Sequence, residues 1–320
     1  YLNIFPKYFV STKGLNTTKG KIYPLGNISK IKTILDNENG SFPIVKTDEY
    51  GFNNPIDLYA PNKTDLLLLG DSYVEGYSVS SEDTIASHLR NFNFRAISLG
   101  KAGNGPLTLL ASLIEYGIFL KPKIILWFYS QNDFEDLTLE TKNNILNKYL
   151  NKENFSQNLI LKQPEIDEAL KNLLNTKLKK KIIEEKEFNN AKFKNLVKLK
   201  KIRSFFNLYN TYYEHTHTND FKEIISKANK IVSNWGGNII FVYLPTHKRY
   251  TLAQEIDLNR KFVLKTIRDL KIPLIDMHEI FIEHKDIDSL FPLRLGGHYN
   301  SKGYNLVAET IKKRINKTNY

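Results

Sequence analysis

The chain has 320 residues, of which 41% are hydrophobic and 12% are aromatic. It can therefore bury a large core, and it is not of the disordered class. It contains no cysteine, which excludes disulfides, thiolate metal sites and a cysteine nucleophile. No segment approaches the ~20 uninterrupted apolar residues of a membrane-spanning helix. The chain begins at Tyr1 and not at methionine, which leaves open a preceding signal or membrane anchor.

The first 60 residues read as an irregular N-terminal wrap of short strands and loops. They contain four prolines and a turn-like Asn-Glu-Asn-Gly at 37–40, and such residues interrupt regular structure. We therefore expect residues 1–60 to lie against a folded domain that begins near residue 61.

Four consecutive leucines at 66–69 run into Gly70, Asp71 and Ser72. An apolar run of this length predicts a short strand that is buried on both faces. Ser72 then lies just past the carboxyl end of the strand, which is where ligands bind in open α/β sheets. The pattern is not G-x-S-x-G, so it does not indicate the nucleophile elbow of an α/β-hydrolase.

Further apolar runs alternate with segments of helical character. This alternation predicts a parallel sheet with helices on both faces. The expected strands are at 94–99, 123–129, 238–245 and 272–276, and the expected helices are near 81–89, 107–120, 221–234 and 251–269. Polar segments follow two of the strands, at 100–106 and 130–133. We expect both segments to meet Ser72 at the carboxyl edge of the sheet.

The net charge of +12 is concentrated in one segment. Residues 141–203 hold fifteen lysines and one arginine against seven acidic residues, so nine of the twelve net charges lie there. Apolar residues three and four apart within this segment predict amphipathic helices. We expect 141–204 to be a basic helical insertion. Its charge is either a solvated helical face, which is the commoner case, or a surface for an anionic glycan or membrane. No recognised motif accompanies the charge, so we expect no nucleic-acid partner.

Two histidine motifs follow the insertion. His215 and His217 form an H-x-H pair without a clear third ligand, so a polar loop is favoured over a metal site. Near the C-terminus, His298 follows Gly296 and Gly297 on a loop that precedes a last helix. Such a loop can bring a histidine to a neighbouring strand end, where it exchanges protons near neutral pH. The alternative is a histidine that serves only in packing.

Together these motifs resemble those of the SGNH (GDSL) hydrolase family. The resemblance covers about 61–137 and 205–320, and it implies a flavodoxin-like three-layer α/β/α fold with a parallel sheet. The catalytic domain would then comprise 61–140 and 205–320. Ser72 matches the family's nucleophile and His298 its base. Gly103 and Asn132 match the residues that, together with the Ser72 N–H, form the oxyanion hole. The resemblance implies no metal and no organic cofactor.

Two residues depart from the family pattern. Ser130 stands where the family usually has a glycine. Leu295 stands three residues before His298, where the family places the aspartate that orients the histidine ring. Either another acceptor orients His298, such as a backbone carbonyl, Asp286 or Asp288, or the site is slow or inactive.

The resemblance therefore predicts a serine esterase or an O-acetyltransferase that acts on an acyl ester or on an acetylated polysaccharide. It favours an extracytoplasmic location in a bacterium, with a membrane-anchored context left open. The alternative, motivated by Leu295, is a weak or inactive protein of this fold that binds a glycan or a protein partner.

Overall fold

The computed structural model describes residues 4–6, 14–190, 217–251 and 259–318. At its centre lies a five-stranded sheet with the strand order β10-β9-β8-β6-β7, and every neighbouring pair is parallel. The strands are β6 (Leu66–Leu69), β7 (Ala96–Ser98), β8 (Ile124–Tyr129), β9 (Asn238–Tyr243) and β10 (Leu274–Asp276). The first of them, β6, lies between the second and the third. The strand order therefore reverses there, which creates the crevice at which α/β sheets bind ligands.

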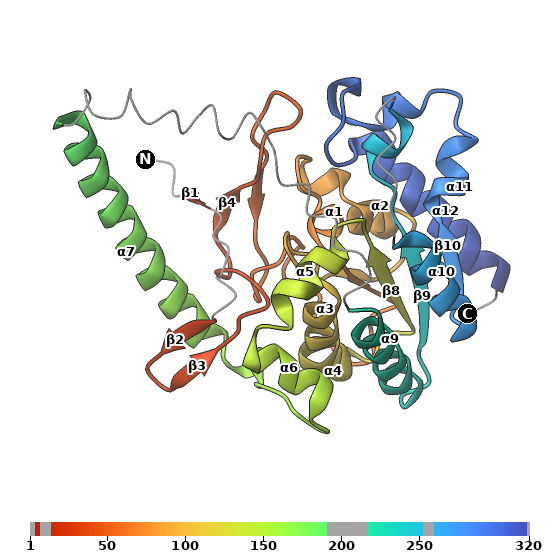
Figure 1. Cartoon of the computed structure of the whole chain (residues 1–320), viewed down its shortest axis with the longest axis horizontal. Helices are drawn as coiled ribbons and strands as arrows, with labels where there is room; N and C mark the ends of the chain where they lie inside the picture. Colours follow the sequence, from red (N-terminus) through yellow and green to blue (C-terminus); the bar gives the residue numbers. More distant parts are fainter. Residues whose placement is uncertain (1–3, 7–13, 191–216, 252–258, 319–320) are drawn as a thin grey trace.

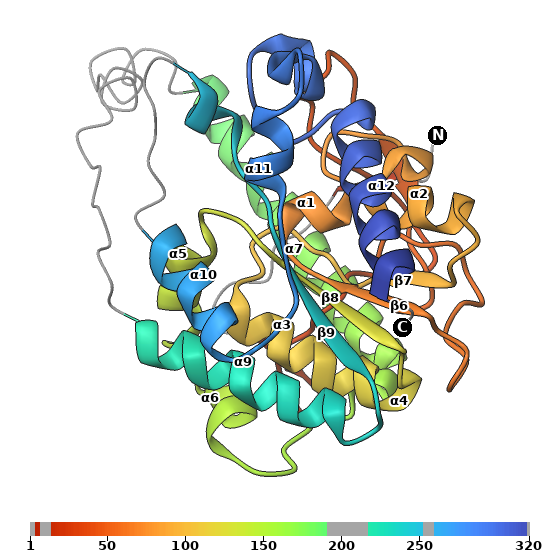
Figure 2. The ribbon, with the colours of Figure 1, turned by 90° about the vertical axis from the view of Figure 1, so that its right-hand side faces the viewer.

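Helices cover both faces of this sheet (Figures 1 and 2). Successive strand residues point to opposite faces, so Leu67 and Leu69 join one hydrophobic core while Leu66 and Leu68 join the other. The first core is closed by α3 (Pro106–Ser112), α6 (Asn144–Asn151), α9 (Thr218–Ser233) and α10 (Arg260–Asp269). The second is closed by α1 (Ser72–Glu75), α2 (Ile85–Asn91), α11 (Met277–Ile282) and α12 (Ser301–Thr318). The predicted three-layer α/β/α fold is confirmed.

The N-terminal segment packs on the first core. It forms a three-stranded sheet from β1 (Ile4–Pro6), β4 (Lys32–Ile34) and β5 (Ile44–Lys46), and a hairpin from β2 (Leu15–Thr17) and β3 (Gly20–Ile22). Five apolar residues anchor it in the core: Leu15, Ile22, Leu25, Ile28 and Phe52. Because β4 and β5 are antiparallel, they hold the loop 35–43 between them.

The segment after β8 begins with α5 (Asp133–Glu140) and continues through α6, the short turn η3 (Leu159–Leu161) and α7 (Gln163–Asn190). Its first part is fastened to the body by the buried Glu115, which accepts hydrogen bonds from the Tyr149 and Ser156 hydroxyls and from the backbone N–H groups of Gln157 and Leu159. The long helix α7 then extends beside the N-terminal hairpin (Figure 1). Residues 191–204, the remainder of the basic helical insertion, lie outside the described residues.

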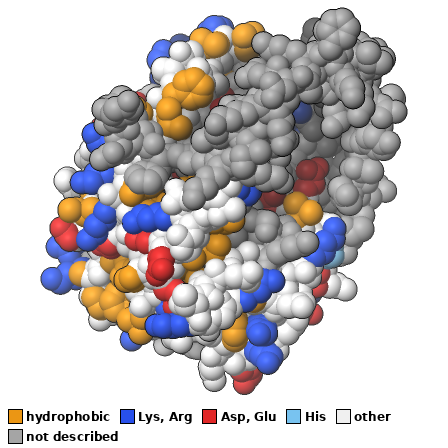
Figure 3. All heavy atoms as spheres, turned by 90° about the vertical axis from the view of Figure 1, so that its left-hand side faces the viewer, with side chains coloured by type: hydrophobic (Ala, Val, Ile, Leu, Met, Phe, Trp, Pro, Cys, Tyr) orange, Lys and Arg blue, Asp and Glu red, His pale blue; other side chains and the backbone are white. Residues whose placement is uncertain are grey.

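The described basic side chains on the α7 side of the molecule lie among acidic and apolar ones and form no continuous patch in that view (Figure 3). Among the described residues, no helix combines the length and the apolar character that crossing a membrane requires.

Candidate active site

Ser72 is the first residue of α1, directly beyond the carboxyl end of β6. The preceding Asp71 caps this helix, because its carboxylate accepts a hydrogen bond from the Tyr73 N–H at 3.0 Å. Gly70 gives the turn its tightness, since a Cβ added there would lie 2.3 Å from Val74 Cγ2. The turn leaves Ser72 half-buried, with its hydroxyl directed toward the C-terminal loop.

His298 contacts the Ser72 hydroxyl. Its Nε2 lies 2.7 Å from Ser72 Oγ, although 226 residues separate the two along the chain. The imidazole lies between two tyrosines, with ring centroids 4.6 Å from Tyr73 and 4.9 Å from Tyr77. The structure therefore brings the predicted nucleophile and the predicted base into direct contact.

Glu38, from the loop between β4 and β5, contacts the other ring nitrogen of His298. Its Oε1 lies 2.9 Å from His298 Nδ1, and its Oε2 accepts a hydrogen bond from the His298 backbone N–H at 2.8 Å. Partial burial raises the pKa of Glu38, but the hydrogen bonds and charge of His298 outweigh it and bring the pKa below its ordinary value. An ionised carboxylate only accepts hydrogen bonds. Nδ1 therefore carries a proton, and Nε2 can accept the proton of Ser72.

The expectation that Asp286 or Asp288 orients His298 was wrong. Asp286 forms a two-pronged ion pair with Arg294, both distances being 2.8 Å. Asp288 Oδ1 lies 2.9 Å from His247 Nε2. Both carboxylates are therefore held by other partners, and Leu295 is 81% exposed with no part in orienting the ring.

Two features bring Glu38 to the histidine. Its loop is tied to the segment that follows α1, because Asn39 Nδ2 donates to the Ser78 carbonyl at 2.7 Å. Gly297 then leaves room for the carboxylate, since a Cβ added there would lie 2.7 Å from Glu38 Oε2. The sequence contains only a weak signal for Glu38. A glycine pair before His298 permits another group to approach closely, but it does not identify that group.

The predicted oxyanion donors lie on the loops after β7 and β8. Gly103 is exposed and has a positive φ of 80°. The Asn132 side chain is fixed at both ends, because its oxygen accepts from Ser130 Oγ at 2.8 Å and its nitrogen donates to Asp136 at 2.7 Å. An amide nitrogen has two protons, and the Asn132 side chain also hydrogen-bonds the Asp71 carboxylate.

Ser130, which replaces the usual glycine, lies within a group of carboxyls. Its hydroxyl is 2.8 Å from Asp71 and 2.9 Å from Asp133. Burial raises the pKa of Asp71, and burial together with the Asp71 charge raises that of Asp133 well above its ordinary value. The same two causes raise the pKa of Asp136 to about 6. Ser130 thus links the cap of the nucleophile's helix to the asparagine of the predicted oxyanion hole.

A cleft of about 400 Å³ opens beside the serine and the histidine. It is lined by Tyr73, Gln131, Asn132, Glu135, Thr246, His247, Lys248 and Gly297. These residues come from the carboxyl ends of β6, β8 and β9, three neighbouring strands, and from the loop that carries His298. Its position is that of the crevice which the sheet topology creates.

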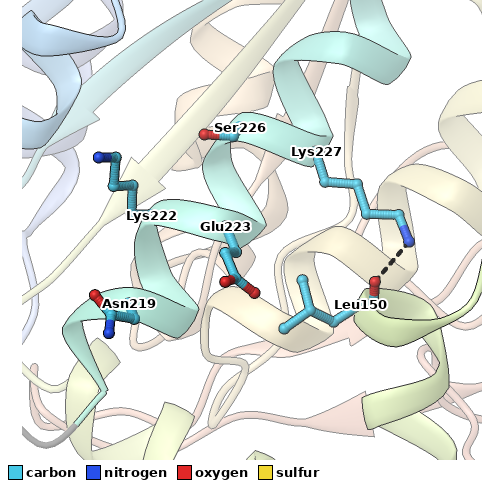
Figure 4. A pocket seen from close by; sticks show the side chains of 6 residues that line it. All are labelled: Leu150, Asn219, Lys222, Glu223, Ser226 and Lys227. Atoms are coloured by element: carbon cyan, nitrogen blue, oxygen red, sulfur yellow. Dashed lines mark hydrogen bonds between the residues drawn. The ribbon is translucent and has the colours of Figure 1, made fainter.

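A second hollow, of about 510 Å³, lies between α6 and α9 and has a different character (Figure 4). One of its two lysines, Lys227, extends to the end of α6, where its ammonium donates to the carbonyls of Tyr149, Leu150 and Lys152. Its lining includes one serine and no histidine. Lys227 therefore caps a helix end, and the hollow has no activated nucleophile.

Within the described part of the chain, no group of three histidine or acidic side chains is arranged to hold a metal ion. His217 pairs with Asp220 at 2.8 Å, and His215 lies outside the described residues.

No family model and no curated protein matches the chain. The solved structures to which it is similar include a lipase/acylhydrolase from Enterococcus faecalis (12% identity, 79% of this chain and 95% of that chain, TM-score 0.46). Another is a putative lipolytic protein of the G-D-S-L family from Desulfitobacterium hafniense (12% identity, 78% of this chain and 98% of that chain, TM-score 0.45). A third is a putative acylhydrolase from Bacteroides fragilis (16% identity, 82% of this chain and 92% of that chain, TM-score 0.42).

Proposed function

We propose that this protein is a serine-dependent acyl ester hydrolase whose triad is Ser72, His298 and Glu38. The observation that carries the proposal is the unbroken chain of contacts from Ser72 Oγ through both nitrogens of His298 to the Glu38 carboxylate. A base placed between a hydroxyl and an orienting carboxylate is the arrangement that activates a serine.

In the first half-reaction, Ser72 Oγ attacks the ester carbonyl carbon while its proton passes to His298 Nε2. Glu38 stabilises the imidazolium that forms. The Ser72 and Gly103 N–H groups and the side-chain NH₂ group of Asn132 are the proposed donors to the oxyanion. When the tetrahedral intermediate collapses, the carbon–oxygen bond to the alcohol breaks, and the proton on Nε2 passes to the departing oxygen.

In the second half-reaction, a hydroxyl compound attacks the acyl carbon and gives its proton to His298 Nε2. The bond between the acyl carbon and Ser72 Oγ then breaks, and the proton passes from Nε2 to Ser72 Oγ. Water gives a carboxylic acid, whereas a sugar hydroxyl gives a new ester, so hydrolysis and O-acyl transfer share the same residues. Hydrolysis is proposed as the basal reaction because water needs no acceptor site.

The proposed substrate is an acetylated polysaccharide, encountered outside the cytoplasm of a bacterium. The site needs neither metal nor organic cofactor. The alternative of an inactive binding protein rested on Leu295, and the position of Glu38 supports the catalytic function instead, because it supplies the acid that Leu295 does not.

The test is turnover of p-nitrophenyl acetate. The wild-type protein should hydrolyse this ester, and Ser72→Ala should lose at least about 10³-fold in kcat/KM, as expected when a nucleophile is removed. Ser233→Ala, a substitution on the distant helix α9, is the matched control and should retain full activity. Turnover that survives Ser72→Ala in the folded protein would place the nucleophile elsewhere.

A further inference from the structure

We propose that Ser130 is a positioning residue for the oxyanion donor Asn132, and that a proton kept by the buried carboxyls of Asp71 and Asp133 enables it to be one. The inference rests on the proposed ester hydrolysis and adds one residue to it. Ser130 is buried and acts through Asn132. The proposal gives a function to the serine that stands where the SGNH (GDSL) family usually has a glycine.

The orientation of the Asn132 amide follows from its two partners. Its Nδ2 lies 2.7 Å from Asp136 Oδ2, and its Oδ1 lies 2.8 Å from Ser130 Oγ. Burial and the Asp71 charge raise the pKa of Asp136 to about 6, so this carboxylate is mostly ionised at neutral pH. An ionised carboxylate only accepts hydrogen bonds. The NH₂ group therefore faces Asp136, and the amide oxygen faces Ser130.

The Ser130 hydroxyl must then donate its proton to Asn132. An amide oxygen carries no proton, and a hydroxyl has a single proton to donate. The same hydroxyl oxygen lies 2.8 Å from Asp71 Oδ2 and 2.9 Å from Asp133 Oδ1. With the hydroxyl proton used on Asn132, a carboxyl must supply the proton for a second hydrogen bond. At least one of the two aspartates is thus a neutral acid that donates to Ser130.

The surroundings of the two aspartates favour the neutral form. Asp71, Ser130 and Asp133 are at most 4% exposed, and burial disfavours a charged carboxyl. Burial is the largest cause that raises the pKa of both aspartates, and the Asp71 and Asp136 charges raise the pKa of Asp133 further. Two interacting carboxyls titrate as a pair, so we assign the proton to the pair and not to one residue.

The retained proton has two consequences for the reaction. It frees the Ser130 hydroxyl to hold the oxygen of Asn132, which keeps the NH₂ group in one orientation. It also weakens a competitor, because the Asn132 side chain hydrogen-bonds the Asp71 carboxyl, and a neutral carboxyl accepts a hydrogen bond less strongly than an ionised one. A developing oxyanion then competes well for the same amide proton, and one less negative charge opposes it.

The kinetic test removes the Ser130 hydroxyl. Ser130→Ala should lower kcat on p-nitrophenyl acetate about 10-fold with KM nearly unchanged, because a displaced oxyanion donor costs less than the 10²–10³-fold of a deleted one. Ser112→Ala, the same change at a serine of α3 that is also buried, should leave kcat unchanged. Circular dichroism checks that both variants are folded. A Ser130→Ala enzyme with the wild-type kcat would overturn the positioning role.

A double-mutant cycle separates positioning from a general structural effect. In the Asn132→Ala background the amide is absent, so Ser130→Ala should change kcat by less than about 2-fold. Two losses that multiply would overturn the positioning role, because Ser130 would then act independently of Asn132. A folded wild-type protein that turns over no ester, with Ser72 unlabelled by a fluorophosphonate, would instead overturn the proposed function.

Infrared spectroscopy tests the proton without relying on activity. Labelling with carboxyl-¹³C aspartate shifts the carbonyl band of a protonated aspartic acid but not that of Glu140, whose pKa is raised to about 8 by burial. At slightly alkaline pH, Asp48 and Asp136, each with a pKa of about 6, are ionised. We expect one label-sensitive band there, which is lost in Asp71→Asn or in Asp133→Asn. The absence of this band, or its persistence in both variants, would overturn the retained proton.

Discussion

Two histidine–carboxylate pairs lie side by side at the loop that carries Gly296 and Gly297. Glu38 contacts His298 and Asp288 contacts His247, each with a nitrogen–oxygen distance of 2.9 Å. A Cβ on Gly297 would meet the first carboxylate, and a Cβ on Gly296 would meet the second histidine, 3.1 Å away. The pairs differ at the ring nitrogen that does not contact the carboxylate. In His298 this nitrogen is Nε2, and it contacts Ser72 Oγ. A histidine–carboxylate pair is thus a candidate for serine catalysis only where a hydroxyl contacts the second ring nitrogen.

The largest expected difference between the pairs lies in their carboxylates. Glu38→Gln keeps the shape of the side chain but removes the charge that stabilises the imidazolium. We expect a loss of about 10²–10⁴ in kcat on p-nitrophenyl acetate, the upper figure being the worth of the equivalent aspartate in the serine proteases. Asp288→Asn should stay within about 3-fold of wild type. Equal losses of kcat in the two variants would contradict a catalytic role for the Glu38–His298 pair alone.

The two glycines provide a matched steric test. Both have a positive φ, 118° at Gly296 and 91° at Gly297, so alanine strains the backbone at both positions, typically by about 1–3 kcal/mol. Only Gly297→Ala also displaces Glu38. We expect Gly297→Ala to lower kcat about 10-fold more than Gly296→Ala, when both are assayed at a temperature where circular dichroism shows them folded. The reverse order would contradict the assigned role of Glu38.

A smaller effect is expected from placing an aspartate at position 295, where the SGNH (GDSL) family that the sequence resembles has one. Leu295→Asp adds a carboxylate three residues before His298, but Glu38 already occupies Nδ1. We expect kcat to remain within about 3-fold of wild type. Because Leu295 is 81% exposed, the free energy of unfolding should change by no more than about 0.5 kcal/mol. A large gain in rate would show that Glu38 does not orient the ring in solution.

The smallest effect concerns stability and pH. The pKa of Glu38 lies below its model-peptide value of 4.5 in the folded protein. Its ionisation therefore stabilises the fold above pH 4.5, and this contribution is lost as the pH falls through the folded-state pKa. The difference in unfolding free energy between wild type and Glu38→Gln should be constant near neutral pH and shrink below about pH 4.5. Denaturant titrations at several pH values measure it, and a difference that grows toward acid pH would contradict the lowered pKa.

Much of the fold was predictable because its signals are local. Apolar runs predict strands that are buried on both faces, as in β6, β8 and β9. The polar residues after these strands lie at the edge of the sheet. Ser72, Asn132 and His298 were predicted because their motifs resemble those of the SGNH (GDSL) family, and each lies at a strand end or before a helix. The structure confirms the fold, and it places Ser72 Oγ 2.7 Å from His298 Nε2.

Glu38 could not be predicted in this way. It lies in a polar turn between two three-residue strands, 260 residues before the histidine that it contacts, and no periodicity connects the two. Asp286 and Asp288 were chosen because they are near His298 in sequence, but Arg294 and His247 take their carboxylates. Which acid reaches a histidine depends on tertiary packing, and local patterns do not encode it.

The most direct measurement is covalent labelling with a fluorophosphonate, followed by mass spectrometry of the modified peptide. The reagent reacts with a serine that an adjacent base activates. We expect one adduct per chain, on Ser72, formed much more slowly in Glu38→Gln and at the wild-type rate in Asp288→Asn. A folded protein that forms no adduct, or one whose Ser72 labels equally fast without the Glu38 carboxylate, would contradict it.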